Sequence, residues 1–93
     1  MELTHVPGKK AADIVLYALS TCGWCHKTKQ LLDSNGIEYS YVYVDLLSKE
    51  DKDTTMQIVE KFNPGRTFPT LVINNKDSII WFKEDDIRSA LKL

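Results

Sequence analysis

The sequence predicts an α/β fold with the element order βαβαββα, in which helices cover both faces of a four-stranded mixed sheet. Three observations support this prediction. An apolar run at 14–19 leads into a segment with helical periodicity, a second segment rich in strand-forming residues follows at 38–45, and two short apolar runs flank a polar turn at 74–77. These patterns indicate a strand–helix–strand unit that is followed, after another helix, by a β-hairpin.

The first strand–helix–strand unit begins with Ile14 to Leu19, a continuous apolar run with β-branched and aromatic side chains. Such a run is typical of a strand buried on both faces of a sheet. From Gly23 the apolar positions take helical spacing, and the helix is predicted to end near Gly36, because glycine suits a left-handed cap. The segment from Glu38 to Asp45 is rich in Tyr and Val, which favour strands. Because a helical crossover joins the two strands, we expect them to be parallel.

A second helix is predicted after this unit. Ser48 with Asp51 three residues later resembles a capping box, and apolar residues at helical spacing continue to Phe62. The sequence Asn-Pro-Gly at 63–65 ends this helix.

A hairpin and a last helix complete the predicted fold. The apolar runs at 70–73 and 78–81 flank Asn-Asn-Lys-Asp, a turn of residue types that tolerate positive φ. Acidic residues at 84–86 favour a helix N-terminus, and apolar residues then recur at helical spacing to Leu91. The hairpin strands therefore pair with each other, and the last helix covers the sheet.

The length, composition and charge of the chain limit its number of domains and the classes of partner that it can bind. Its 93 residues, 43% of them hydrophobic and 27% charged, suffice for one core. We divide them into an N-terminal extension at 1–12, with an edge strand around Leu3 to Val6, and a domain at 13–93. The net charge of −1 provides no basic surplus for nucleic acid or an anionic membrane. The longest apolar run is too short for a membrane span or a targeting peptide, so we expect the protein to be cytoplasmic. We also expect it to be a monomer.

The sequence contains two cysteines, Cys22 and Cys25, which form a C-x-x-C motif between the first strand and its helix. In this context the motif is typical of a dithiol redox site. The Cys22 sulfur is expected to meet the free N–H groups and the positive dipole end of the helix, which stabilise a thiolate. Cys25 lies one turn further and is expected to be more shielded, as the second thiol. Such chemistry requires no bound cofactor and no metal.

Three other interpretations of the cysteine pair remain open. With His26 the motif also matches C-x-x-C-H, the string to which c-type haem is attached, although no all-helical haem pocket is predicted. A zinc site requires about four ligands, and beyond these three residues only the distant His5 is available. The two cysteines could also serve packing alone.

Pro69, in the sequence Thr67-Phe68-Pro69, is a further candidate functional residue. It could simply begin an edge strand, where a missing N–H is harmless. Alternatively, a cis Phe68–Pro69 bond would turn the chain so that the backbone of Phe68 faces the sulfurs and pairs with an extended disulfide substrate.

From about Ile14 to Leu91 these features resemble the glutaredoxin branch of the thioredoxin superfamily. The resemblance implies a thioredoxin fold and the activity of a thiol–disulfide oxidoreductase, a small dithiol electron carrier that acts on protein disulfides. It also implies that Cys22 is the nucleophile, that Cys25 resolves the mixed disulfide, and that Pro69 is cis. The predicted substrate-binding residues are Tyr17, Trp24, Arg66, Thr67, Phe68, Pro69 and Asp85.

Within this branch, the sequences around His26, Arg66 and Trp81 look most like those of the NrdH-type redoxins. That resemblance implies thioredoxin reductase as electron donor and ribonucleotide reductase as a client. Glutathione-binding members usually have a basic residue where this chain has Leu19, and a Gly-Gly pair where it has Ile80-Trp81. Glutathione nevertheless stays open as a donor, because Arg66 could receive a carboxylate and Asp85 an α-amino group.

Two further expectations concern groups near the motif. Trp24, Tyr17, Phe68 and Trp81 are candidates for an apolar rim around the sulfurs, whereas Lys27, Lys29 and His26 either tune the thiolate and meet a partner or are merely solvated.

The alternative function is that of a glutaredoxin-like iron–sulfur carrier, in which two chains each give Cys22 to a bridging cluster. In such proteins glutathione completes the ligand set, so Leu19 and Trp81 weaken this alternative.

Overall fold

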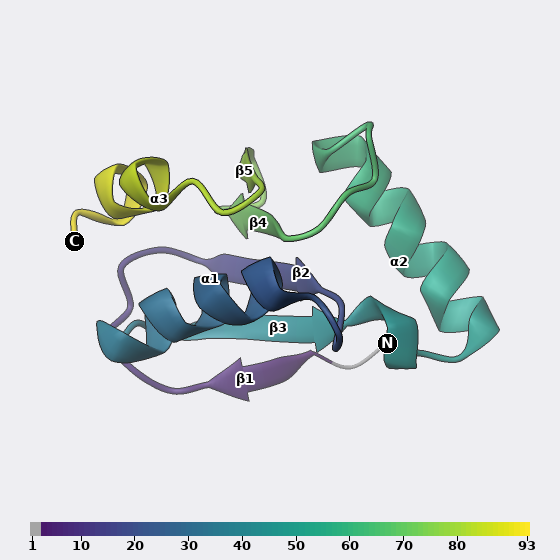
Figure 1. Ribbon diagram of the computed structural model, residues 1–93, viewed down its shortest axis with the longest axis horizontal. Helices are drawn as coiled ribbons and strands as arrows, with labels where there is room; N and C mark the ends of the chain where they lie inside the picture. Colours follow the sequence, from purple (N-terminus) through teal and green to yellow (C-terminus); the bar gives the residue numbers. More distant parts are fainter. Residues whose placement is uncertain (1–2) are drawn as a thin grey trace.

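The structure is a computed structural model that describes residues 3–93. Residues 1–2, which belong to the predicted N-terminal extension, lie outside the described residues. The elements are β1 Thr4–Val6, β2 Ile14–Ala18, α1 Gly23–Ser34, β3 Tyr39–Tyr43, the short 3-10 helix η1 Val44–Leu46, α2 Lys49–Phe62, β4 Thr70–Ile73, β5 Asp77–Ile80 and α3 Glu84–Leu91 (Figure 1). The predicted order βαβαββα is therefore confirmed from β2 to α3.

The sheet has five strands in the order β1-β3-β2-β4-β5, so the prediction of four strands is wrong by one. β2 and β3 are parallel, as expected for strands joined by a helix, and the other pairs are antiparallel. The additional strand, β1, lies at the edge expected near Leu3 to Val6. Backbone hydrogen bonds hold the chain after it: Lys9 N–H donates to the Gly36 carbonyl over 2.7 Å, and Glu38 N–H donates to the Lys9 carbonyl over 2.9 Å.

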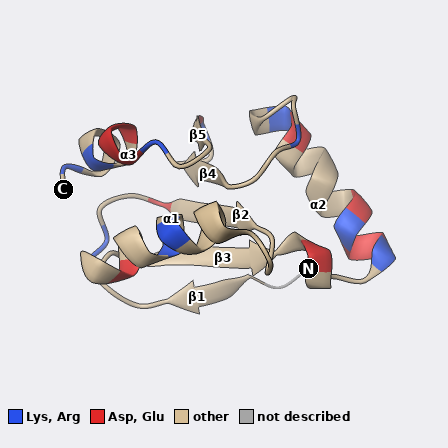
Figure 2. Cartoon of the chain, in the orientation of Figure 1, with Lys and Arg blue, Asp and Glu red and all other residues tan. Residues whose placement is uncertain are grey.

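The two faces of the sheet pack against different helices. Ile14 and Leu16 of β2 belong to the apolar cluster that also contains buried residues of α1 and α3. Tyr17 follows Leu16 in the same strand and points to the opposite face of the sheet, where it belongs to the apolar cluster under α2. This alternation follows from the two-residue period of a strand, and each fully buried Leu or Ile contributes about 1.5–3 kcal/mol to folding. Charged residues lie mainly on the helices and loops, and the only charged residue in a strand of the described chain is Asp77 (Figure 2).

The predicted helix boundaries have clear local causes. The Ser48 side chain caps α2 by accepting the Asp51 N–H over 3.2 Å, which confirms the capping pattern. After α1, Gly36 has a φ of +64°, the left-handed conformation that glycine adopts without strain. In the hairpin turn, Asn74 and Asn75 have φ values of 55° and 52°, as their residue type allows.

The last hairpin strand begins and ends one residue earlier than predicted. The sequence favours a strand to Trp81, whereas β5 ends at Ile80. Trp81 has a φ of 72°, and its N–H donates to the Pro69 carbonyl over 2.9 Å. A left-handed Trp cannot continue a strand, and this conformation costs about 1–2 kcal/mol relative to the right-handed region. The chain therefore turns at Trp81 toward α3.

Candidate redox site

Cys22 is the N-cap residue of α1. Its backbone is extended, with φ −92° and ψ 114°, and its sulfur accepts the Cys25 N–H over 3.2 Å. An N-cap side chain that accepts such a bond satisfies one of the free donors of the helix. The side chain is partly exposed. The sulfur thus lies at the positive end of the helix dipole, where negative charge is stabilised, and a disulfide in solution can reach it.

Cys25 has the opposite environment. Its side chain is 1% exposed and packs in the core beneath α1. Burial, and after it the hydrogen bond with Cys22, raises the pKa of the Cys25 thiol to about 12. Burial disfavours the charged form of a thiol, so Cys25 is protonated at neutral pH while both cysteines are reduced. The two thiols therefore differ in access, because Cys22 is partly exposed and Cys25 is buried.

The turn before Cys22 is held from two sides. The carboxylate of Asp45, at the end of β3, accepts the Ser20 backbone N–H over 2.8 Å and the Ser20 hydroxyl. The Ser20 carbonyl in turn accepts the ring N–H of His26 over 2.8 Å. The hydrogen bonds from Ser20 lower the pKa of the Asp45 carboxyl. We call these hydrogen bonds of Ser20 with Asp45 and His26 the Ser20 clamp. The clamp fixes the segment between β2 and Cys22, and no pattern in the sequence predicts it.

The Pro69 loop is organised by a buried amide. Asn63 is 3% exposed, and its side-chain NH₂ donates to the Thr67 carbonyl, the Thr67 hydroxyl and the Thr70 hydroxyl over 2.9–3.0 Å. The Phe68–Pro69 peptide bond is cis. Pro69 is buried, and Phe68 contacts both apolar clusters. Sequence reasoning assigned Asn63 only to the end of α2, because no local pattern shows that its side chain turns inward.

Aromatic rings lie beside the cysteine pair. Trp24 is 43% exposed and contacts Trp81 with ring centroids 5.9 Å apart and Phe82 at 5.8 Å. The Lys27 ammonium lies 5.1 Å from the centre of the Trp24 ring. We call Trp24, Trp81 and Phe82 the aromatic platform. Part of the predicted apolar rim is therefore present on the surface.

The other predicted binding residues are spread over three segments. Tyr17 is 6% exposed and packs in the core under α2, so its ring is part of the core and not of an exposed rim. Arg66 and Thr67 are exposed in the turn after α2, and Arg66 has a φ of 51°. Asp85 is exposed in the first turn of α3.

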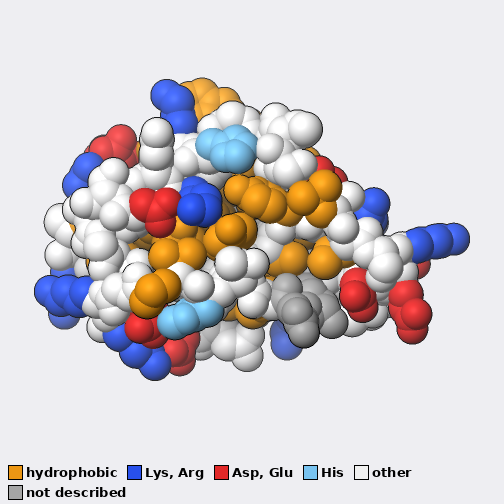
Figure 3. All heavy atoms as spheres, turned by 90° about the horizontal axis from the view of Figure 1, so that it is seen from below, with side chains coloured by type: hydrophobic (Ala, Val, Ile, Leu, Met, Phe, Trp, Pro, Cys, Tyr) orange, Lys and Arg blue, Asp and Glu red, His pale blue; other side chains and the backbone are white. Residues whose placement is uncertain are grey.

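A row of contacting rings runs from α1 onto β3. His26 contacts the ring of Tyr43, which contacts Tyr41, with centroids 6.1 and 5.3 Å apart. Lys29 lies 5.1 Å from the Tyr41 ring and pairs with Asp33 over 3.0 Å. Lys29 is therefore engaged with its own helix and β3. Figure 3 shows the side of the molecule that is at the bottom of Figure 1, where β1 lies. Hydrophobic side chains gather in the middle of that side, with charged side chains mostly around them.

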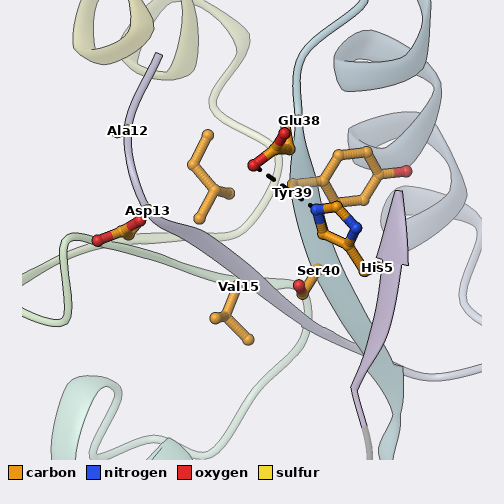
Figure 4. A pocket seen from close by; sticks show the side chains of 8 residues that line it. His5, Ala12, Asp13, Val15, Glu38, Tyr39 and Ser40 are labelled. Carbon is orange, nitrogen blue, oxygen red and sulfur yellow. Dashed lines mark ion pairs between the residues drawn. The ribbon is translucent and has the colours of Figure 1, made fainter. Parts of the chain in front are cut away.

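A hollow of about 260 Å³ lies at the other end of the sheet, where β2 and β3 begin. His5, Asp13, Glu38 and Ser40 contribute polar side chains to its lining, and His5 pairs with Glu38 over 3.6 Å (Figure 4). No residue of the cysteine motif lines it.

Among residues 3–93, no three His, Cys, Asp or Glu side chains gather as a metal site would need, so no observation favours the zinc interpretation. Within the same range, no helix has the length and apolar character to cross a membrane.

A C-x-x-C pair at the N-terminus of a helix, after a central strand of a mixed sheet, defines the class of dithiol redox proteins with a thioredoxin fold. The glutaredoxin family model matches residues 14–78, and the chain belongs to the glutaredoxin family. This confirms the resemblance drawn from the sequence.

Individual relatives support the same family assignment. The chain is 32% identical to glutaredoxin 1 of Rickettsia prowazekii over 62 residues, which cover 67% of this chain and 62% of that protein. The structure is similar to the glutaredoxin of Methanosarcina mazei, with TM-score 0.91 and 41% identity over 100% of this chain and 90% of that one. It is also similar to methanoredoxin of Methanosarcina acetivorans, with TM-score 0.90 and 46% identity over 92% and 90% of the two chains. None of these findings favours the haem or the iron–sulfur alternative.

Proposed function

We propose that the protein is a thiol–disulfide oxidoreductase that carries two electrons on Cys22 and Cys25. The observation that supports this most directly is the contrast between the sulfurs: Cys22 caps a helix and is accessible, whereas Cys25 is buried and protonated. Membership of the glutaredoxin family supports the same reaction.

The reaction proceeds by two exchanges. The Cys22 thiolate attacks one sulfur of the substrate disulfide, forms a mixed disulfide and releases the other substrate sulfur as a thiolate. Cys25 then loses its proton and attacks the Cys22 sulfur, which releases the second substrate thiol and leaves a Cys22–Cys25 disulfide. The substrate has gained two electrons, and a dithiol or two thiols must restore the pair.

Substitution of each cysteine tests these roles. We expect Cys22→Ser to abolish reduction of hydroxyethyl disulfide and of a protein disulfide, because no accessible nucleophile remains. Cys25→Ser should instead accumulate a mixed disulfide on Cys22, which mass spectrometry detects. Ser34→Ala, at the far end of α1, is the matched control and should retain activity. Equal residual turnover in the two cysteine variants would contradict the assigned roles.

We further propose that the substrates are protein disulfides, ribonucleotide reductase among them, and that a thioredoxin reductase restores the dithiol. This proposal is supported by Leu19 and by the exposed Trp81, because they stand where glutathione-binding relatives have a basic residue and a glycine. Reduction of the oxidised protein by thioredoxin reductase with NADPH, compared with glutathione alone, tests it. Rapid reduction by glutathione alone would overturn this choice of donor and would give Arg66 and Asp85 a role in glutathione binding.

A further inference from the structure

Trp81 combines two features that are unfavourable for folding. Its backbone is left-handed, with φ 72°, a conformation that is a genuine outlier for a bulky side chain. Its side chain is also 46% exposed, so burial does not offset the strain. The other positive-φ residues besides glycine in the described chain are all polar: Arg66, Asn74, Asn75 and Lys92. An exposed, strained residue of this kind points to function and not to stability.

The backbone of Trp81 is tied to the Pro69 loop, and its ring contacts the tryptophan of the cysteine motif. The Trp81 N–H donates to the Pro69 carbonyl over 2.9 Å, which ties the residue to the cis-proline loop. On the other side its ring contacts Trp24, at 5.9 Å between centroids, and Trp24 lies between the two cysteines in the sequence. The ring is therefore fixed between the cis-proline loop and the cysteine motif.

The two tryptophans of the aromatic platform are open to solvent. Trp24 and Trp81 are both close to half exposed, while Phe82 stacks on Trp24 at 5.8 Å with an angle of 26° between the rings. Exposed apolar surface of this kind marks a contact site, and tryptophan is among the residues that contribute most to protein interfaces. Because Trp24 is two residues from Cys22, we expect the residues that flank the cysteine of a client bound to Cys22 to be within reach of this surface.

We propose that Trp81 is a specificity-determining residue, which with Trp24 receives an apolar side chain adjacent to the reactive cysteine of a client protein. The occupant is thus a polypeptide segment with a long aliphatic or aromatic residue next to its disulfide. The site continues directly from the redox pair, and a small polar disulfide would leave it uncovered. This inference rests on the proposed disulfide reduction.

Matched peptide disulfides test the proposal. Two hexapeptides that differ only in Leu or Ser after a single cysteine, each joined by a disulfide to mercaptoethanol, serve as substrates, with hydroxyethyl disulfide as reference. We expect the protein to reduce the Leu peptide with a kcat/KM about fivefold higher, a preference equal to about 1 kcal/mol. In Trp81→Gly the ratio of the two kcat/KM values, for the Leu and the Ser peptide, should fall below about twofold. Trp81→Phe should keep most of the preference.

The controls separate the possible failures. Leu3→Ser alters another exposed apolar residue, 39% exposed on the N-terminal segment, and should leave the preference unchanged. Thermal melting verifies the fold of Trp81→Gly, which we expect to be at least as stable because glycine adopts φ 72° without strain. Equal reduction of the two peptides by the unaltered protein, or an unchanged preference in Trp81→Gly, would overturn the role of Trp81. Failure of the unaltered protein to reduce even hydroxyethyl disulfide would overturn the proposed function itself.

Discussion

The two ends of the parallel pair β2 and β3 carry different kinds of polar site. Where these strands end, the Asp45 carboxylate binds Ser20 through two hydrogen bonds, and α1 presents its free N–H groups to Cys22. Where they begin, His5 and Glu38 line an open hollow, with side chains 57% and 32% exposed. Only the carboxyl ends lead into a helix N-terminus, and ligands of open α/β sheets bind at that edge. The comparison shows that the Asp45 carboxylate has fixed partners at the redox end, whereas the His5–Glu38 pair at the opposite end is open to solvent.

The largest expected effect is at Asn63, which supports the cis-proline loop at the redox end. Asn63→Ala removes three donated hydrogen bonds and leaves the buried Thr70 hydroxyl without its donor. We expect the free energy of unfolding to fall by about 2–4 kcal/mol, measured by urea denaturation. Asn35→Ala is the matched control, because the exposed Asn35 donates only to the Leu31 carbonyl; it should lose about 1 kcal/mol or less. Equal losses would show that burial does not distinguish the two amides.

A smaller effect is expected from Asp45→Asn, which weakens the Ser20 clamp. We expect disulfide reduction at pH 7 to slow about threefold and stability to fall by about 1 kcal/mol, at the low end for a hydrogen bond to a charged group because the carboxylate is partly solvated. Asp77→Asn, at an exposed hairpin position, should change neither quantity measurably.

The Asp45 effect should also depend on pH in a defined direction. The hydrogen bonds from Ser20 lower the folded-state pKa of this carboxyl from its ordinary 3.8. Its contribution is therefore fully present above 3.8 and is lost as the pH falls through the lower folded-state value. The stability difference between the protein and Asp45→Asn should be constant from pH 5 to 7 and should disappear in stronger acid. A difference that persists there would mean that the carboxylate charge is not responsible.

The sequence predicted what depends on local patterns and missed what depends on distant contacts. The element order, the cap at Ser48 and the contrast between Cys22 and Cys25 all follow from residues within a few positions of one another. The Ser20 clamp joins residues 25 positions apart, and no pattern around Asp45 indicates it. Trp81 has strong strand propensity, yet its backbone is left-handed, with φ 72°, and the strand ends before it. Tertiary contacts override local propensity at such positions.

The smallest effect is expected at the opposite end of the sheet, from Glu38→Gln. The His5–Glu38 pair spans 3.6 Å between largely solvated side chains, and its charge exists only while His5 is protonated. Exposed pairs contribute about 0–1 kcal/mol and are screened by salt, so we expect a stability change below about 0.5 kcal/mol and unchanged disulfide reduction. Comparing unfolding and turnover at low and high ionic strength measures both. A change of more than twofold in turnover would mean that the hollow is coupled to the redox turn through β2 and β3, and the contrast between the two ends would fail.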